Sequence, residues 1–248
     1  MTMLFKKLFI AIVLLISFAG TLQAAPPKVL VFGKTTSFYH ESIPDGMAAI
    51  QLLGKKMGFD VDTTRDASAF TDDNLKQYAA VVFVNTADES STLLTPAQRD
   101  AFVHFIQSGK GYVGIHAAAD AEYNWPWYNK LVGAYFKSHP KQQEAELHVA
   151  DANFAATKTL PSTWKHFDEW YNYKETNWDD VHVLLTVDEK SYTGGENGDN
   201  HPICWYHNYD GGRSFYVGLG HTKECYSDPL FLKLLSGGIM YAITNQEK

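Results

Sequence analysis

Residues 111–118 read Gly-Tyr-Val-Gly-Ile-His-Ala-Ala, an apolar run that ends in a histidine flanked by small residues. A short, continuous apolar run that begins at a glycine is typical of a strand buried on both faces, as in a parallel sheet. The small residues at its end allow a sharp strand-to-helix turn from which one side chain projects. We therefore expect a strand over 111–116 and a turn that presents the imidazole of His116.

Similar runs come earlier in the chain, and helical patterns separate them. Apolar residues repeat at helical spacing from Ile43 to Met57, Thr71 can cap a short helix, and Thr-Pro-Ala-Gln at 95–98 is a helix start with a capping box. Parallel neighbours need crossover connections, which are usually helices. The predicted fold class is therefore α/β, a doubly wound parallel sheet whose earlier strands lie at 28–33, 59–63 and 79–84.

The second half of the chain has the pattern of antiparallel strands. An Asp-Gly-Gly turn at 210–212 predicts a hairpin, because Asp-Gly supplies the positive φ that such turns require. A last helix is expected from Asp228 onwards. These strands are expected to extend the sheet within a single domain over 25–248, and they are predicted at 145–150, 167–173, 182–187, 202–209 and 213–220.

The first 24 residues have the layout of a secretory signal peptide. Two lysines, Lys6 and Lys7, precede an apolar run over 8–19, and Ala24 offers a small residue at the cleavage point. The run is short for a membrane span, so an uncleaved anchor is the disfavoured alternative. We predict that residues 1–24 are removed and that the mature chain is periplasmic or secreted, with no stable membrane anchoring.

The charge of the chain argues against nucleic acid as a partner. Removing residues 1–24 takes away two lysines and no acid, so the formal charge changes from −7 to −9. The two cysteines, Cys204 and Cys225, both belong to the exported part, where oxidation is possible. A disulfide and a pair of buried thiols are equally compatible with the sequence.

Five short motifs cover nearly the whole mature chain. Two of them are Phe-Tyr-His-Glu-Ser-Ile at 38–43 and Gly-Ile-His-Ala-Ala-Ala-Asp at 114–120. The others lie at 136–140, 168–171 and 212–221. In this order they resemble the motifs of ThuA-like (trehalose utilisation) proteins.

The resemblance implies a fold similar to that of class I glutamine amidotransferases, which is flavodoxin-like in its parallel part. It also implies a role in the catabolism of trehalose and related disaccharides. The sharp strand-to-helix turn carries His116 at the position where the amidotransferases carry a cysteine nucleophile. We therefore do not expect a glutamine amidotransferase, and residual amidase or peptidase activity is disfavoured for the same reason.

Three residues are the predicted catalytic groups. In a doubly wound sheet ligands bind beyond the carboxyl ends of the strands, where His40 and His116 lie. Asp168 and Glu169 are expected to point to opposite faces of a strand, so that only one faces the cleft. The family motif favours Glu169 as the acid or base. The alternatives are a packed, inert His116 and a solvated acidic strand edge.

A second set is predicted to bind the substrate. Trp125 and Trp127, on either side of Pro126, are candidate platforms for the flat face of a sugar, although ordinary packing would also explain such rings. Tyr171 is expected beside the catalytic carboxylate as a hydrogen-bonding partner. The remaining members of the set follow predicted strands or belong to the family motifs, and they are Tyr39, Asp120, His139 and His221.

No metal or other cofactor is predicted, although a divalent cation stays open as a possibility. Four histidines fall on separate loops that could converge: His40, His116, His139 and His221. The sequence has none of the short ligand spacings that mark many zinc sites. We do expect His40, His116, Glu169 and His221 to line one cleft.

The function predicted from these residues is that of an exported protein that handles a small-molecule saccharide. As an enzyme it would be a hydrolase, lyase or isomerase that acts on a disaccharide, a glycoside or an oxidised (keto) sugar by acid/base chemistry. The alternative is a non-catalytic sugar-binding protein that uses the same cleft.

Overall fold

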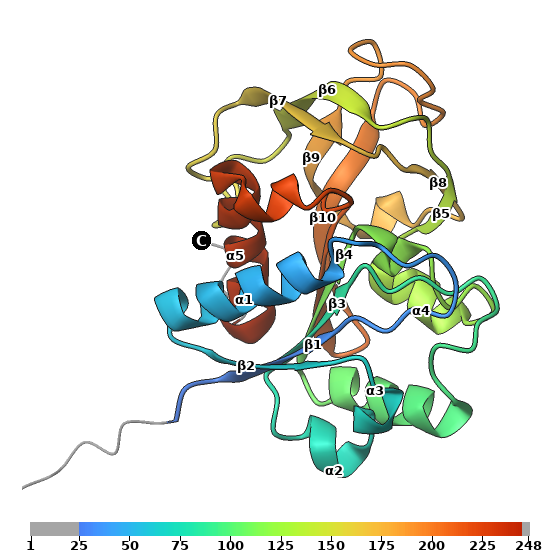
Figure 1. The fold of residues 1–248 in the computed structure, drawn as a ribbon, viewed down its shortest axis with the longest axis vertical. Coiled ribbons are helices and arrows are strands. Elements are labelled where there is room, and N and C mark those ends of the chain that lie inside the picture. The colour runs from blue at the N-terminus through green and yellow to red at the C-terminus, as the bar shows by residue number, and fades with distance from the viewer. Residues whose placement is uncertain (1–24, 245–248) are drawn as a thin grey trace, which may run out of the picture.

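The computed structural model describes residues 25–244, through which a nine-stranded sheet runs (Figure 1). Its parallel part has the order β2-β1-β3-β4, in which β3 and β4 are buried at every residue. This is the order of the flavodoxin-like sheet. The strands are β1 (Lys28–Phe32), β2 (Asp60–Thr64), β3 (Ala80–Val84) and β4 (Gly111–Ile115).

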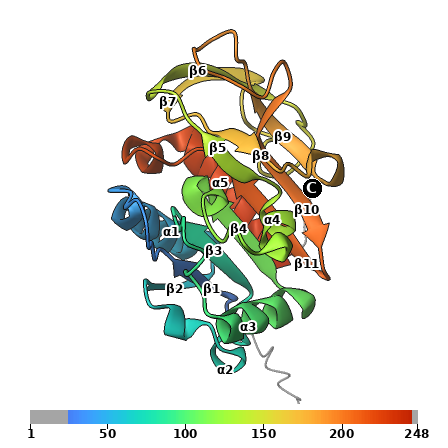
Figure 2. The ribbon, with the colours of Figure 1, turned by 90° about the vertical axis from the view of Figure 1, so that its right-hand side faces the viewer.

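The second half of the chain continues the same sheet. Strand β11 pairs parallel to β4, and the remaining strands add to it in the antiparallel order β10-β9-β6-β7. A separate pair, β5 and β8, lies beside this extension (Figure 2). The bounds are β5 (Tyr135–Ser138), β6 (Gln143–Val149), β7 (Thr163–Asp168), β8 (Asn172–Lys174), β9 (His182–Val187), β10 (His201–Tyr209) and β11 (Gly212–Val217).

Helices cover the two faces of the parallel part, as the prediction of a doubly wound sheet requires (Figures 1 and 2). Helices α1 and α5 lie together on one side, and α3 and α4 lie on the other. The predicted capping box of Thr95 and Gln98 is present at the start of α3. The helices are α1 (Ile43–Met57), α2 (Asp72–Leu75), α3 (Pro96–Gln107), α4 (Pro126–Val132) and α5 (Pro229–Thr244).

The predicted strand over 167–173 is wrong in its extent. Strand β7 starts earlier and ends at Asp168, and the chain then crosses to β8 in the smaller sheet. The ladder ends there because the buried Asp168 carboxylate accepts hydrogen bonds from the backbone nitrogens of Glu169, Gly220 and Thr222. A side chain that binds backbone groups in this way competes with strand pairing.

Both cysteines are buried free thiols, so the structure agrees with the second of the two alternatives for Cys204 and Cys225. No helix within residues 25–244 is long and apolar enough to cross a membrane. The predicted signal peptide, residues 1–24, lies outside the described part of the chain.

Candidate functional site

The turn after β4 has the sharp geometry that the small residues predict. His116 adopts a positive φ of 45°, which is rare for a residue with a side chain. A Cβ on Gly114 would lie 3.2 Å from that of Ala118, so the turn needs a small residue there. The backbone is fixed from outside, because Tyr216 donates its hydroxyl hydrogen to the carbonyl of His116.

The imidazole of His116 is buried and oriented by the backbone. Its Nδ1 lies 2.8 Å from the carbonyl oxygen of Gly218, which can only accept, so Nδ1 carries a proton. The other nitrogen, Nε2, therefore faces His221 and Glu169, at 3.2 Å and 3.4 Å. His116 is thus buried, as the alternative of a packed, inert histidine requires. Its Nε2, however, belongs to a polar cluster.

Four of the predicted site residues meet at the carboxyl edge of the parallel sheet. His40 follows β1, His116 follows β4, and His221 follows β11, while Glu169 lies in the link between β7 and β8. Glu169 Oε2 is 3.1 Å from His221 Nδ1, and its Oε1 is 3.1 Å from Nδ1 of His139. Donor atoms of His40, His116, Glu169 and His221 therefore lie together, as expected. The expectation that all four line one cleft is wrong for His116, because only His40, Glu169 and His221 line the cavity beside the cluster and His116 is fully buried behind them.

The cluster favours one protonation state for two of its members. Burial opposes the ionisation of Glu169, but His116 and His221 outweigh it and hold the pKa of this carboxyl well below its usual range. Burial, and then the neighbouring imidazoles of His116 and His221, lower the pKa of His40 to about 2. Glu169 is therefore a carboxylate and His40 a neutral imidazole.

A cavity of about 350 Å³ opens beside this cluster. It is large enough for a small ligand. Asp120 faces it, and burial raises the pKa of this carboxyl to about 6, although the hydroxyl of Tyr123 donates a hydrogen bond to it. The lining residues are Phe38, His40, Glu89, Asp120, Phe136, His139, Gln142, Glu169, Tyr171 and His221.

Three predicted substrate-binding residues do not line this cavity. Pro126 starts α4, which brings the rings of Trp125 and Trp127 together, 5.0 Å apart, and Trp127 Nε1 donates to Asp210 in the hairpin turn. Tyr39 accepts a hydrogen bond from Arg65 instead. The predicted tryptophan platform is therefore not part of this cavity.

The aromatic part of the cavity comes from Phe38, Phe136 and Tyr171. Phe38 and Phe136 begin two of the five motifs, and that was the signal that could have identified them. Glu89 and Gln142 have no comparable signal, since each stands in a polar loop outside the motifs. Asp168 and Glu169 are both buried, so they do not form a solvated strand edge.

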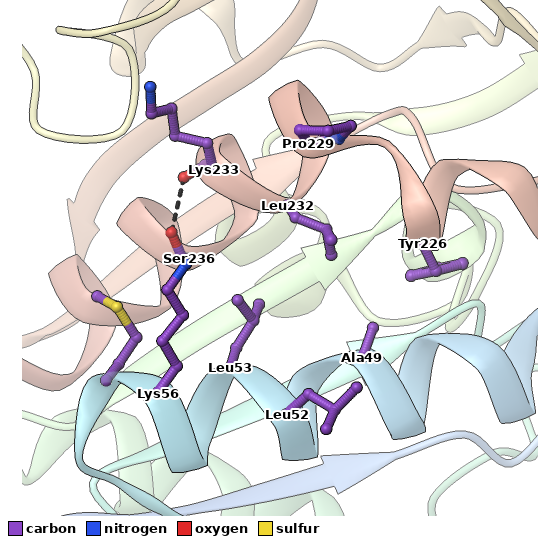
Figure 3. A pocket seen from close by; sticks show the side chains of 10 residues that line it. Ala49, Leu52, Leu53, Lys56, Tyr226, Pro229, Leu232, Lys233 and Ser236 are labelled. Atoms are coloured by element: carbon purple, nitrogen blue, oxygen red, sulfur yellow. Dashed lines mark hydrogen bonds between the residues drawn. The ribbon is translucent and has the colours of Figure 1, made fainter.

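A larger cavity, of about 510 Å³, lies elsewhere, between α1 and α5 (Figure 3). Its walls are mainly apolar side chains such as Leu52, Leu53 and Leu232, together with Lys56 of α1 and Lys233 of α5. It contains no carboxylate or imidazole. The smaller cavity beside Glu169 is therefore the candidate functional site.

Comparison with known proteins agrees with the five motifs. A crystal structure of a putative ThuA-like protein from Bacteroides uniformis is 27% identical, with a TM-score of 0.76 over 93% of this chain and 97% of that one. One from Parabacteroides merdae, at 23% identity, shares the fold with a TM-score of 0.70 over 90% and 92%. A β-galactosidase from Bacillus circulans shares the fold alone, at 11% identity and a TM-score of 0.55, over 88% of this chain and 31% of that one.

No curated protein sequence matches the chain. The family model described as trehalose utilisation, ThuA, matches residues 28–242, which is most of the chain. The predicted fold class is confirmed, a class I glutamine amidotransferase-like α/β fold with a largely parallel sheet extended by antiparallel strands. The chain therefore belongs to the ThuA, or trehalose utilisation, family.

Proposed function

We propose that this protein is an exported enzyme that converts a disaccharide, a glycoside or a keto sugar by acid/base chemistry. The family to which the chain belongs is described as trehalose utilisation, and this suggests sugars as the class of substrate. The observation that carries the proposal is that two buried carboxyl groups, Asp120 and Glu169, line one cavity together with imidazoles. Such a set can both give and accept protons next to a bound ligand.

The two carboxyl groups have different surroundings, and this suggests different roles. Glu169 lies against the imidazole nitrogens of His116 and His221, which keep it ionised. Burial makes Asp120 hold a proton more readily, although the hydrogen bond donated by the hydroxyl of Tyr123 acts in the opposite direction. Paired acids whose environments separate them in this way are typical of proton-transfer sites. Asp120 is thus the proton donor, and Glu169 stays a carboxylate.

The walls of the cavity suit a hydroxyl-rich ligand with an apolar face. His139 and Gln142 offer polar groups, and Phe38 and Phe136 offer flat rings. Sugars present both kinds of surface, and aromatic rings pack well against their C–H faces. These residues support a saccharide rather than a fully apolar ligand.

A screen of purified residues 25–248 against disaccharides, glycosides and 3-ketoglycosides tests the proposal. We expect turnover of at least one compound, with the rate measured by product formation. A saccharide that binds without any turnover across the panel would identify a sugar-binding protein and contradict the enzymatic proposal.

Replacing Asp120 by asparagine removes the ionisable proton of this side chain and is expected to stabilise the protein. The folded-state pKa of about 6 lies above the ordinary 3.8, so the protein loses stability as the pH rises through this interval, and the loss stays constant above it. The groups that act on it are Tyr123, Glu89, His116 and Lys174. In chelator-treated protein, the advantage of Asp120→Asn over wild type should grow by about 2 kcal/mol between pH 4 and pH 8.

Urea unfolding of both forms at the two pH values measures this difference. An advantage that does not change with pH would show that Asp120 ionises as freely in the folded as in the unfolded chain. Turnover of Asp120→Asn should fall by about 10²- to 10⁴-fold even though the variant is more stable.

A further inference from the structure

Three imidazoles and one carboxylate from four separate loops converge beside the cavity. One donor atom from each of His40, His116, Glu169 and His221 lies within 4.8 Å of all the others. We infer that these four residues form a binding site for one divalent cation of the zinc class. The inference goes beyond the proposed function, because it rests on the donor atoms and not on the identity of a sugar.

The distances within the cluster match those between the ligands of one tetrahedral ion. Zn²⁺ binds nitrogen and carboxylate oxygen at about 2.0–2.2 Å, so neighbouring donor atoms of a tetrahedral site lie about 3.3 Å apart. His116 Nε2 and His221 Nδ1 are 3.2 Å apart, and they lie 3.4 Å and 3.1 Å from Glu169 Oε2. These three atoms therefore have the spacing of one face of the tetrahedron.

The arrangement of the rings places His40 as the fourth ligand. Three imidazoles that share one tetrahedral ion have ring centres about 5 Å apart. The centres of His40 and His116 are 5.2 Å apart, those of His40 and His221 are 4.9 Å apart, and those of His116 and His221 are 5.2 Å apart. The rings are thus spaced evenly around a common point.

Two further observations point to a missing partner. His40 is buried, and its Nδ1 has no hydrogen-bonding partner among the described residues. An imidazole nitrogen without a partner is costly in a buried position. The Nδ1–H of His116 is held by the carbonyl of Gly218, which is the usual way in which a metal-binding histidine is fixed in one tautomer.

The chemistry of the donors favours zinc over harder cations. Imidazole suits Zn²⁺ and related transition metals, whereas Mg²⁺ and Ca²⁺ prefer oxygen ligands. Three of the four donor residues, His40, Glu169 and His221, also line the cavity. Four protein ligands fill a tetrahedral shell, so a cation there would polarise an oxygen atom of a bound ligand only by expanding to five-coordination, while Asp120 remains available for proton transfer.

The test is zinc binding by the whole mature chain after treatment with a chelator. Titration calorimetry with Zn²⁺ alone, together with metal analysis after dialysis, is expected to give one ion per chain. His40→Ala, Glu169→Gln and His221→Ala should each weaken binding on the order of 10²-fold, since each removes one ligand. The control is His104→Gln, because His104 is an exposed histidine of α3 that pairs with Asp72.

Thermal unfolding of each variant shows whether it is folded before binding is compared. If His40→Ala or His221→Ala does not fold, the comparison rests on Glu169→Gln, which keeps the shape of the side chain. Wild type that binds no zinc, or variants that bind it as well as His104→Gln does, would overturn the inference and leave a hydrogen-bonded imidazole–carboxylate cluster.

The same material separates this inference from the proposed function. Asp120→Asn should bind zinc like wild type and lose turnover. Zinc binding without turnover of any saccharide would support the cation site and reject the enzymatic proposal. Turnover without zinc binding would support the enzymatic proposal and reject the cation site.

Discussion

Replacing Glu169 by glutamine is expected to lower turnover by about 10²- to 10⁴-fold while saccharide binding persists. Glutamine keeps the shape of the side chain and one oxygen acceptor, but it removes the charge that faces His116, His139 and His221. Affinity should change only by the weakened hydrogen bonds, roughly 1.5–3 kcal/mol where a charged group is lost. Rate and affinity are measured with one saccharide on both forms.

A matched control is Glu41→Gln, since the Glu41 side chain is 77% exposed and lies one residue beyond His40. Its turnover should equal that of wild type. Unchanged turnover in Glu169→Gln would show that Glu169 has no part in the reaction, and His116 would be the next residue to replace.

Replacing Gly111 by alanine is expected to lower the free energy of unfolding by about 3 kcal/mol. A Cβ at this position would lie 2.2 Å from the carbonyl oxygen of Ala242 in α5. That oxygen also accepts two hydrogen bonds from the Arg213 guanidinium, at 3.1 Å and 2.8 Å, so it cannot move away freely. Urea unfolding with a fluorescence or circular dichroism readout measures the loss.

The comparison for this variant is Gly58→Ala, at the end of α1. Gly58 has nothing within 4 Å of a built Cβ, but its φ is 84°. Alanine there costs only the left-handed backbone, about 1 kcal/mol. Equal losses in the two variants would mean that α5 does not pack closely on the start of β4.

The parallel half of the fold could be predicted because its signals are local. Residues 29–33 and 111–115 are apolar without interruption, as strands buried on both faces must be, and the structure gives strands over Lys28–Phe32 and Gly111–Ile115. The end of β7 could not be predicted in the same way. Asp168 ends that strand by binding Gly220 and Thr222, more than fifty residues further along the chain.

The residues of the site were likewise predictable only where the signal is local in the sequence. The small residues around His116 predict its sharp turn, and strand order then brings His40 and His221 to the same edge. The sequence left a cation open as a possibility because histidines on separate loops could converge, but no short ligand spacing marks the candidate cation site, since no two of its ligands are close in sequence. Trp125 and Trp127 do not line the cavity as predicted, because Pro126 starts a helix that packs both rings against their neighbours. A local sequence pattern does not reveal this packing.

The most direct test of the account is the crystal structure of Glu169→Gln with the saccharide that wild type converts. The account predicts a sugar ring in the cavity beside Asp120, with one of its oxygens within hydrogen-bonding distance, about 2.6–3.2 Å, of the Asp120 carboxyl group. A sugar bound instead in the apolar cavity between α1 and α5, with the cavity beside Asp120 free of ligand, would contradict it.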